Sequence, residues 1–473
     1  MQIHKAYIAG KFRQTEKTVE VRNPYNNELV GIACIGLKDD LEDAIKGAES
    51  VFPSLKTLPS FKRYNILMHI HRRLETDKQC LAEILANEAA KPIKLAIGEI
   101  ERASETFKIA AEESKRLPKE YISLDWTPAG EGKEGLVKYF PVGLVAGISP
   151  FNFPMNLAVH KIAPAIAAGC PIILKPSTST PLSTLELAKI IDETELPKGA
   201  VSILPMDRQT GNQLVTDDRI KLLTFTGSPE VGWKMKEQAG KKKVVLELGG
   251  NAGVIVSDSC DLELVLRKCL VGGFAYAGQV CIHAQRIYVQ QNFFILFSER
   301  FAALASKLKT GNPLDPETDI TSMIDETNAK RVEDWVAEAV NEGARILCGG
   351  KRDGSFYEPT VLTGTKTEMK VCALEVFGPV VVVEPYSDFK DAVGQINNSR
   401  YGLQAGVFTN RVDEMNQAFE HLEVGGVIIN DVPTFRVDHM PYGGVKDSGT
   451  GREGVKYAIH DMMEPRLLVK PAF

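Results

Sequence analysis

Short, continuously apolar segments alternate with longer amphipathic segments along most of this chain, and this alternation constrains the fold more than any other feature. Runs of Val, Ile and Leu are typical of strands buried on both faces of a parallel sheet. The longer segments, such as Thr180–Leu196 and Asp325–Gly343, show the spacing of helices that cover such a sheet. The sequence therefore predicts an α/β fold with right-handed crossovers. The predicted strands are Pro171–Leu174, Lys221–Thr226, Gly253–Val256, Val380–Val383, Leu403–Phe408 and Gly426–Ile429.

Length and composition set the scale of the fold and exclude several classes of protein. The 473 residues, of which 44% are hydrophobic and 25% charged, suffice for two or three domains with sizeable cores. A net charge of −5 argues against a nucleic-acid partner, which would favour a basic surface. The eight cysteines form no CxxC pair and no zinc-finger spacing. We therefore expect no metal site and a reduced, cytoplasmic protein.

One segment has the length of a membrane span. Residues 139–160 carry no Asp, Glu, Lys or Arg. The run nevertheless contains three prolines and two asparagines, Asn152 and Asn156, which a lipid-facing helix would not tolerate together. We expect buried loop and strand here, and no association with a membrane.

The clearest strand-to-helix junction is KLLTFTGSPEVGWKMKEQAG. Gly227 allows a tight turn after the strand, Ser228 suits the N-cap, and Pro229 suits the first helical position. Gly240 suits the left-handed position past the helix end. The free N–H groups of such a helix start can bind a pyrophosphate, although an ordinary βα turn has the same pattern.

Three residues are candidates for chemistry. Cys281 lies on a glycine-containing loop, VGGFAYAGQVC, where its Sγ and its backbone N–H can both face a substrate. Glu247 ends the strand before paired glycines and can reach into a cleft as a base. Asn152 lies between prolines that fix its backbone, which suits an oxyanion donor. The alternatives are an inert buried cysteine, a salt-bridged glutamate and a turn-forming asparagine.

Together these motifs resemble the aldehyde dehydrogenase superfamily. GISPFNFP, ILKPS, FTGSPEVG, LELGGN, GQVC, EVFGP and PYGGVKDSG occur in this order, over nearly the whole chain from about Tyr7 to Val469. The resemblance implies that the thiolate of Cys281 adds to an aldehyde, that Asn152 and the Cys281 N–H hold the oxyanion, and that Glu247 activates the water that hydrolyses the thioester.

The resemblance also implies an NAD(P) cofactor, bound without a GxGxxG motif. Lys175 and Glu375 match the family residues that hydrogen-bond the adenosine ribose and the nicotinamide ribose. Thr178 stands where many NAD-preferring members carry a Glu that repels a 2′-phosphate, so we expect NADP to be accepted as well as NAD. The implied cofactor residues are Ile148, Ser149, Pro150, Phe151, Lys175, Ser177, Thr178, Gly211, Gly227, Ser228, Gly232, Leu248, Glu375 and Phe377.

The ending TFRVDHMPYGGVKDSGTGREG resembles members that act on small polar or anionic aldehydes, including lactaldehyde and phosphonoacetaldehyde-type enzymes. Non-phosphorylating glyceraldehyde-3-phosphate dehydrogenases are more distant, because Val280 replaces their Arg before the nucleophile. Arg102, His160 and Arg436 are candidates for binding an anionic group, and a structural ion pair is the alternative for each. A different class of function, a catalytically silent binding protein, would be expected to lack one of the three chemical residues.

The resemblance further predicts three parts and a homodimer or homotetramer. A dinucleotide-binding domain takes residues 1–118 and 139–249, and a catalytic domain takes 250–440. Two strand-like runs joined by Thr127–Lys133 predict a hairpin, and Pro465–Lys470 predicts another strand. The segments 119–138 and 463–473 would form an oligomerisation element that extends a neighbour's sheet.

Overall fold

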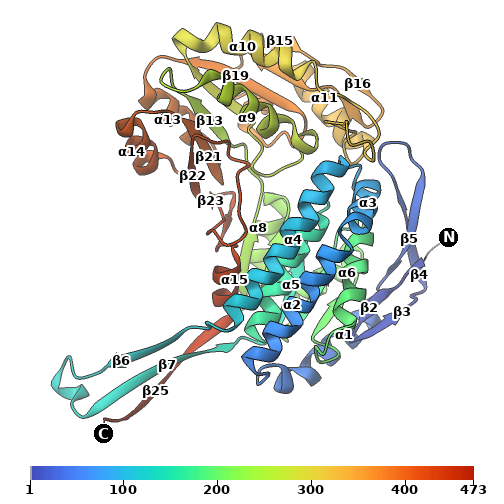
Figure 1. Ribbon diagram of the computed structural model, residues 1–473, viewed down its shortest axis with the longest axis vertical. Helices are drawn as coiled ribbons and strands as arrows, with labels where there is room; N and C mark the ends of the chain where they lie inside the picture. The colour runs from blue at the N-terminus through green and yellow to red at the C-terminus, as the bar shows by residue number, and fades with distance from the viewer. Residues whose placement is uncertain (1–2, 473) are drawn as a thin grey trace.

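The predicted apolar segments form strands of two large sheets in the computed structural model, which describes residues 3–472 (Figure 1). Five of them lie inside a sheet, whereas Gly426–Ile429 is an edge strand and only half-buried, contrary to the expectation of burial on both faces. Neighbouring strands at the centre of each sheet are parallel, and helices cover both faces. The predicted α/β fold class is confirmed. The predicted dinucleotide-binding domain begins at residue 1 and the predicted oligomerisation element ends at residue 473. Residues 1–2 and 473 lie outside the part of the chain that the structure describes.

The first sheet has eight strands in the order β24-β12-β11-β8-β9-β10-β2-β3. Its centre is parallel, and β2, β3 and β24 pair antiparallel at the edges. Side chains of one strand point alternately into two hydrophobic cores: Ile172 and Leu174 into one, Ile173 into the other. The strands are β2 (Ala6–Ile8), β3 (Lys11–Arg13), β8 (Leu144–Ile148), β9 (Ile172–Lys175), β10 (Val201–Ile203), β11 (Ile220–Thr226), β12 (Lys243–Glu247) and β24 (Gly449–Thr450).

Two groups of helices cover the faces of this sheet. The larger core packs against α2 (Ser60–Thr76), α3 (Lys78–Ala89), α4 (Ile93–Ser114), α5 (Pro154–Ala168), α6 (Leu182–Asp192) and α15 (Val455–Asp461). The opposite core packs against α1 (Lys38–Leu55), α7 (Arg208–Thr216) and α8 (Pro229–Gln238). A small sheet of β1 (Ile3–His4), β5 (Leu29–Ile35) and β4 (Lys17–Arg22) lies beside them.

The second sheet has seven strands in the order β15-β18-β19-β14-β13-β21-β22. It is parallel except for β15 at one edge. Val254 and Ile255 again enter different cores. The strands are β13 (Gly253–Val256), β14 (Arg286–Gln290), β15 (Arg345–Cys348), β18 (Thr360–Thr363), β19 (Val380–Tyr386), β21 (Gln404–Phe408) and β22 (Gly426–Ile429), and the helices are α9 (Leu262–Phe274), α10 (Gln291–Ala305), α11 (Glu326–Asn341), α12 (Lys370–Ala373), α13 (Phe389–Asn397) and α14 (Val412–His421).

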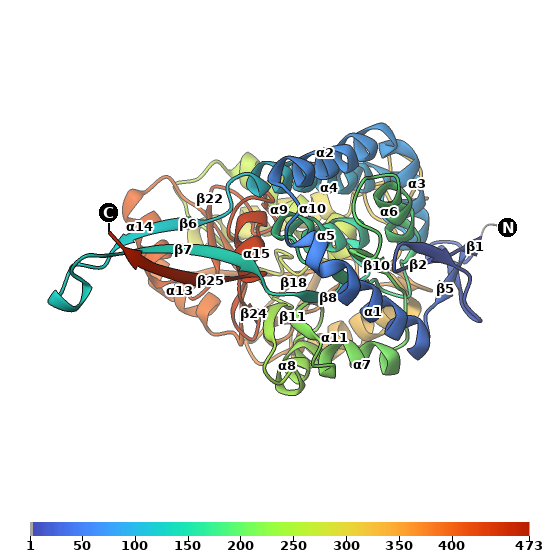
Figure 2. The same cartoon turned by 90° about the horizontal axis from the view of Figure 1, so that it is seen from below.

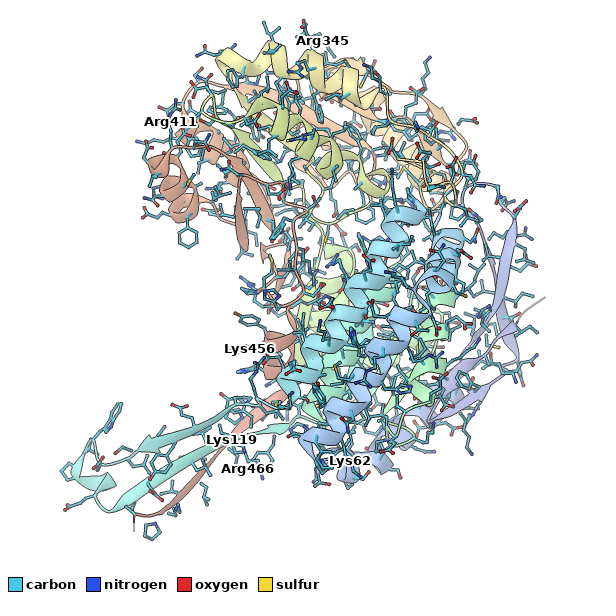
Figure 3. The ribbon with its side chains drawn as sticks, in the orientation of Figure 1. Lys62, Lys119, Arg345, Arg411, Lys456 and Arg466 are labelled. Carbon is cyan, nitrogen blue, oxygen red and sulfur yellow. The ribbon has the colours of Figure 1, made fainter. Side chains whose placement is uncertain are left out.

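The first sheet with its helices is called the first body below, and the second sheet with its helices the second body. A three-stranded arm projects from the first body (Figure 2). β6 (Lys119–Ser123) and β7 (Lys133–Pro141) form the predicted hairpin, and β25 (Met463–Pro471) pairs along the other edge of β7. The predicted hairpin and the predicted C-terminal strand are therefore confirmed. Lys119 and Arg466, both labelled on the arm in Figure 3, flank Lys138 across the three strands, which gives the arm a basic row.

Two segments differ from the expectations. Loop and strand were expected throughout 139–160, but helix α5 begins at Pro154, so the last third of that run is helical. Every residue of α5 is buried, which leaves it without the polar face by which a helix is usually recognised. Residues 441–462, which the predicted division leaves unassigned, return to the first body through β24 and α15. No helix within residues 3–472 is long and apolar enough to cross a membrane.

Candidate active site

A cavity of about 730 Å³ lies between the two bodies. The first body contributes the loops that follow β8, β11 and β12, because the carboxyl ends of these parallel strands meet at one edge of the sheet. The second body contributes the loop after α9 and the loop before β19. Cys281, Glu247 and Asn152 all line this cavity, so the structure brings the three predicted chemical residues together.

Cys281 lies on the loop that joins α9 to β14. A short 3₁₀ turn, Ala275–Gly278, precedes it, and within that turn Tyr276 and Ala277 both have a positive φ of 51°. Sγ of Cys281 lies 3.1 Å from Oη of Tyr442. Burial raises the pKa of the thiol to about 11, while the hydrogen bond with Tyr442 acts in the opposite direction.

Asn152 is held in place by contacts with both bodies. Its Nδ2 donates to the carbonyl oxygen of Gln279, 2.9 Å away and two residues before the cysteine. Its own carbonyl oxygen accepts from Nζ of Lys91 at 2.6 Å. Lys91 in turn forms a fully buried ion pair with Glu99, which also accepts the N–H of Met155 at the start of α5. One N–H of the Asn152 amide remains for a ligand.

Glu247 ends β12 and is only 3% exposed. Within the described chain, residues 3–472, neither carboxylate oxygen has a hydrogen-bond partner. Burial raises the pKa of Glu247 well above its usual range, and the negative charge of Glu453 adds to this effect. A carboxyl group that is buried, unpaired and hard to ionise has the properties of a general base.

A network of charged side chains lies behind Glu247. Glu453 contacts Nζ of Lys161 at 3.2 Å and the guanidinium of Arg436 at 3.0 Å. Lys161 also donates to Oγ1 of Thr226 at 2.8 Å. All of these partners except Thr226 carry a formal charge, and the two cations hold the pKa of Glu453 low, at about 2, against the effect of its burial.

The three predicted anion-binding residues differ in position. Arg102 and Arg436 line the cavity, whereas His160 does not. His160 is buried, with Nε2 2.8 Å from Asp438, and burial lowers its pKa. Asp438 also pairs with Arg102 at 2.7 Å, so each of the three takes part in a buried or half-buried ion network. His160 therefore lies outside the cavity, and of its two alternatives the structure has the ion pair.

Half of the predicted cofactor residues line the cavity, and half lie beyond it along the edge of the first sheet. Ser228 directly precedes α8, as predicted for an N-cap, but its side chain forms no capping hydrogen bond with the described residues. Gly240 has the predicted positive φ, 61°. The residues in the cavity wall are Pro150, Phe151, Gly227, Ser228, Leu248, Glu375 and Phe377. Those outside it are Ile148, Ser149, Lys175, Ser177, Thr178, Gly211 and Gly232.

The sequence matches the Aldehyde dehydrogenase family over residues 12–468. The chain belongs to this family. It is 44% identical to the 3-sulfolactaldehyde dehydrogenase of Priestia aryabhattai, over 98% of this chain and 97% of that protein. Aldehyde dehydrogenase 21 from Physcomitrella patens, solved with the reaction product succinate, is 46% identical with a TM-score of 0.98, over 99% of this chain and 98% of that one. The glyceraldehyde-3-phosphate dehydrogenase GapN of Methanocaldococcus jannaschii, solved with NADP, is 39% identical with a TM-score of 0.93, over 97% of this chain and 100% of that one.

Family membership, inferred from seven motifs, is therefore confirmed. Five residues around the site were not singled out from the sequence: Lys91, Glu99, Lys161, Tyr442 and Glu453. For three of them a signal existed. Tyr442 and Glu453 lie in the same C-terminal aldehyde dehydrogenase motif, and Lys161 is the first charge after the uncharged run. Nothing in the sequence around Lys91 and Glu99 distinguishes these buried charges from the charged residues on helix surfaces.

Proposed function

We propose that the protein oxidises a small anionic aldehyde to the carboxylic acid, with NADP or NAD as the electron acceptor, through a covalent intermediate on Cys281. The observation that carries the proposal is the meeting of a thiol, an amide donor and an unpaired buried carboxyl group in one cavity wall. A catalytically silent binding protein would not need all three groups. The alternative substrates are those of the glyceraldehyde-3-phosphate and phosphonoacetaldehyde types.

The first half-reaction is the work of Cys281 and Asn152. The sulfur lone pair forms the S–C bond, and the carbonyl π pair moves to oxygen, where the free N–H of Asn152 and the backbone N–H of Cys281 stabilise it. When bound, NAD(P)⁺ supplies the acceptor for the hydride that leaves the carbon. A thioester on Cys281 remains, and sulfur is a good leaving group for the next step.

Glu247 carries the second half-reaction by taking a proton from the water that attacks the thioester. Its ionised form is disfavoured by burial and by Glu453, and the charges of Arg436 and Lys161 partly offset this. The proton that Glu247 accepts leaves to water before the next turnover, because no side chain among residues 3–472 forms a hydrogen bond with its carboxyl group. The carboxylate of Glu247 is then regenerated.

The first sheet fits a dinucleotide. The N-terminus of α8 is uncapped by the side chain of Ser228, so its first N–H groups can donate to a pyrophosphate. A Cβ on Gly211 would lie 3.0 Å from Cδ of Lys175, which shows how closely the start of α7 approaches this lysine. Lys175 is half-buried, and burial lowers its pKa. In this proposal Lys175 and Thr178 hold the adenosine ribose and its 2′-substituent, and Glu375 holds the nicotinamide ribose.

Replacing Thr178 with glutamate is expected to raise the KM for NADP by about tenfold to a hundredfold and to leave the KM for NAD nearly unchanged. The reason is like-charge repulsion of a 2′-phosphate, on the scale of about 1.5–3 kcal/mol for a charged hydrogen-bond partner. Steady-state kinetics with both cofactors measure the effect. Thr178→Gln is the matched control, because it adds bulk without charge. A wild type without NADP activity, or equal losses in the two variants, would contradict the assignment.

An anionic substrate is supported by two arginines in the cavity wall, Arg102 and Arg436. Their carboxylate partners, Asp438 for Arg102 and Glu453 for Arg436, do not line the cavity. Arg102 is one-third exposed and donates to Asp438 through Nε and one terminal nitrogen, while its other terminal nitrogen forms no hydrogen bond within residues 3–472. The substrate in the name of the Priestia aryabhattai relative and the product bound to the Physcomitrella patens relative are both anionic.

Sulfolactaldehyde and lactaldehyde, which differ by one sulfonate, test this proposal directly. We expect a kcat/KM at least about tenfold higher for the sulfonated compound, and we expect Arg102→Met to remove most of that preference while sparing lactaldehyde. Arg300→Met is the matched control, because Arg300 forms an exposed pair with Glu263 outside the cavity. Equal kcat/KM values for the two aldehydes in the wild type would overturn the anionic assignment.

We also propose a homodimer or homotetramer in which the arm of β6, β7 and β25 contacts a neighbouring subunit. The basic row Lys119, Lys138 and Arg466 supports this, because adjacent like charges on a sheet are unfavourable without a partner. Trp126, at the tip of the hairpin, is 89% exposed. Sedimentation velocity separates either assembly from a monomer of 51.9 kDa.

A further inference from the structure

Tyr442 places a hydroxyl group beside the sulfur of Cys281. Its Oη lies 3.1 Å from Sγ, and its ring is 2% exposed. The backbone of Tyr442 is fixed by two hydrogen bonds with Glu453, of 2.9 and 2.6 Å, and the guanidinium of Arg436 lies 3.8 Å from the ring centroid. The hydroxyl is therefore held at the sulfur by backbone pairing on one side and by a cation–π contact on the other.

Three charged side chains also face the sulfur, and within the described chain none of them donates a hydrogen bond to it. Glu247 and Glu375 approach from the first sheet and from the loop before β19, and both carboxylates oppose ionisation of the thiol. Arg436 favours ionisation but acts through space. Tyr442 is thus the one group among residues 3–472 whose hydrogen bond reaches Sγ.

We propose that Tyr442 is a further catalytic residue, whose hydroxyl donates a hydrogen bond to Sγ of Cys281 and stabilises the thiolate before it attacks. This inference rests on the proposed role of Cys281 as the nucleophile. The S–H bond breaks and its proton passes to water, while the O–H bond of Tyr442 stays intact. When the sulfur lone pair forms the bond to the carbonyl carbon, the sulfur loses its negative charge and the hydrogen bond weakens.

The direction of this hydrogen bond follows from the chemistry of both partners. A thiolate can only accept, so an ionised Cys281 requires the hydroxyl to donate. Burial, together with the charges of Cys281 and Glu247, raises the pKa of Tyr442 well above its usual value. The phenol therefore keeps its proton at every pH at which the enzyme works. A thiol that donates to the phenol instead would be stabilised in its neutral form.

The test is the titration of Cys281 in Tyr442→Phe, a variant that removes a single oxygen atom. Alkylation by iodoacetamide is followed at the peptide that contains Cys281 by mass spectrometry, because the exposed Cys80 reacts as well. We expect the midpoint to rise by about one pH unit or more, and alkylation at neutral pH to slow by about tenfold. Tyr401→Phe is the matched control, because Tyr401 lines the same cavity without a contact to Sγ. An unchanged or lowered midpoint would overturn the proposal.

A second measurement separates this role from a packing role. The rate of the first turnover of reduced cofactor should be lower in Tyr442→Phe while the thiol is mostly protonated, and it should approach the wild-type rate as the pH rises through the midpoints found by alkylation. A deficit of equal size at every pH would indicate packing and would also overturn the proposal. The alkylation titration needs neither aldehyde nor cofactor, so a wild type that oxidises no aldehyde would refute the proposed function without deciding the role of Tyr442.

Discussion

Replacing Cys281 with alanine is expected to reduce aldehyde oxidation by at least about 10³-fold, because the hydride leaves from a carbon that must first bond to sulfur. No other cysteine lines the cavity of the described chain, so no second thiol can substitute. Binding of NADP should stay within about twofold of wild type, since the residues proposed to hold it come from β8, β9, β11 and the loop before β19. Cofactor reduction and fluorescence titration of the cofactor give the two readouts.

Cys80→Ala is the control for this substitution. Cys80 is exposed on α3 and lies outside the cavity, so its loss should leave the oxidation rate unchanged. Retention of more than a few per cent of activity in Cys281→Ala would remove Cys281 from the role of nucleophile. A loss of cofactor affinity in the same variant would indicate instead that the loop after α9 helps to form the cofactor site at the edge of the first sheet.

The layers of this fold could be predicted because its central strands have a recognisable sequence pattern. Ile172, Ile173 and Leu174 enter two different cores, so the strand must be apolar at every position, and such a run stands out in the sequence. Helix α5 was missed for the same physical reason. It is buried on all sides, between the sheet and its neighbours, so its sequence shows no polar face and no helical period.

The meeting of Cys281, Glu247 and Asn152 in one cavity could be predicted because each lies in a recognisable motif at the end of a strand or on a loop. The side chains that hold them could not. Lys91 and Glu99 support Asn152 only because α3, α4 and α5 pack together, and their buried ion pair has no local signature. His160 was a candidate for an anionic group with a structural ion pair as the alternative, and the ion pair with Asp438, 278 residues away, could not be identified from the sequence. The left-handed conformations of Tyr276 and Ala277 also depend on tertiary packing, since side-chain-bearing residues rarely adopt a positive φ.

Replacing Glu247 with glutamine is expected to separate the two half-reactions. The first turnover should still release reduced cofactor at close to the wild-type rate, because the thiol and the oxyanion donors are untouched. Steady-state turnover should fall by about 10²- to 10⁴-fold, the usual contribution of a general base. Rapid mixing resolves the burst, and mass spectrometry of the quenched protein should find the acyl group on Cys281. Glu384→Gln is the control: this half-buried glutamate binds Thr365 through one oxygen, which an amide can replace.

The pH dependence adds an independent check on the role of Glu247. Its pKa is raised by burial first and by Glu453 second, so at acidic pH the carboxyl is protonated where an exposed glutamate would already be ionised. Only the ionised form can accept a proton from water. Deacylation in the wild type should therefore rise with pH as Glu247 ionises, and this rise should be absent from the residual turnover of Glu247→Gln. A burst that disappears together with turnover would show that Glu247 also serves the attack of Cys281, for which its position in the same cavity wall gives it the opportunity.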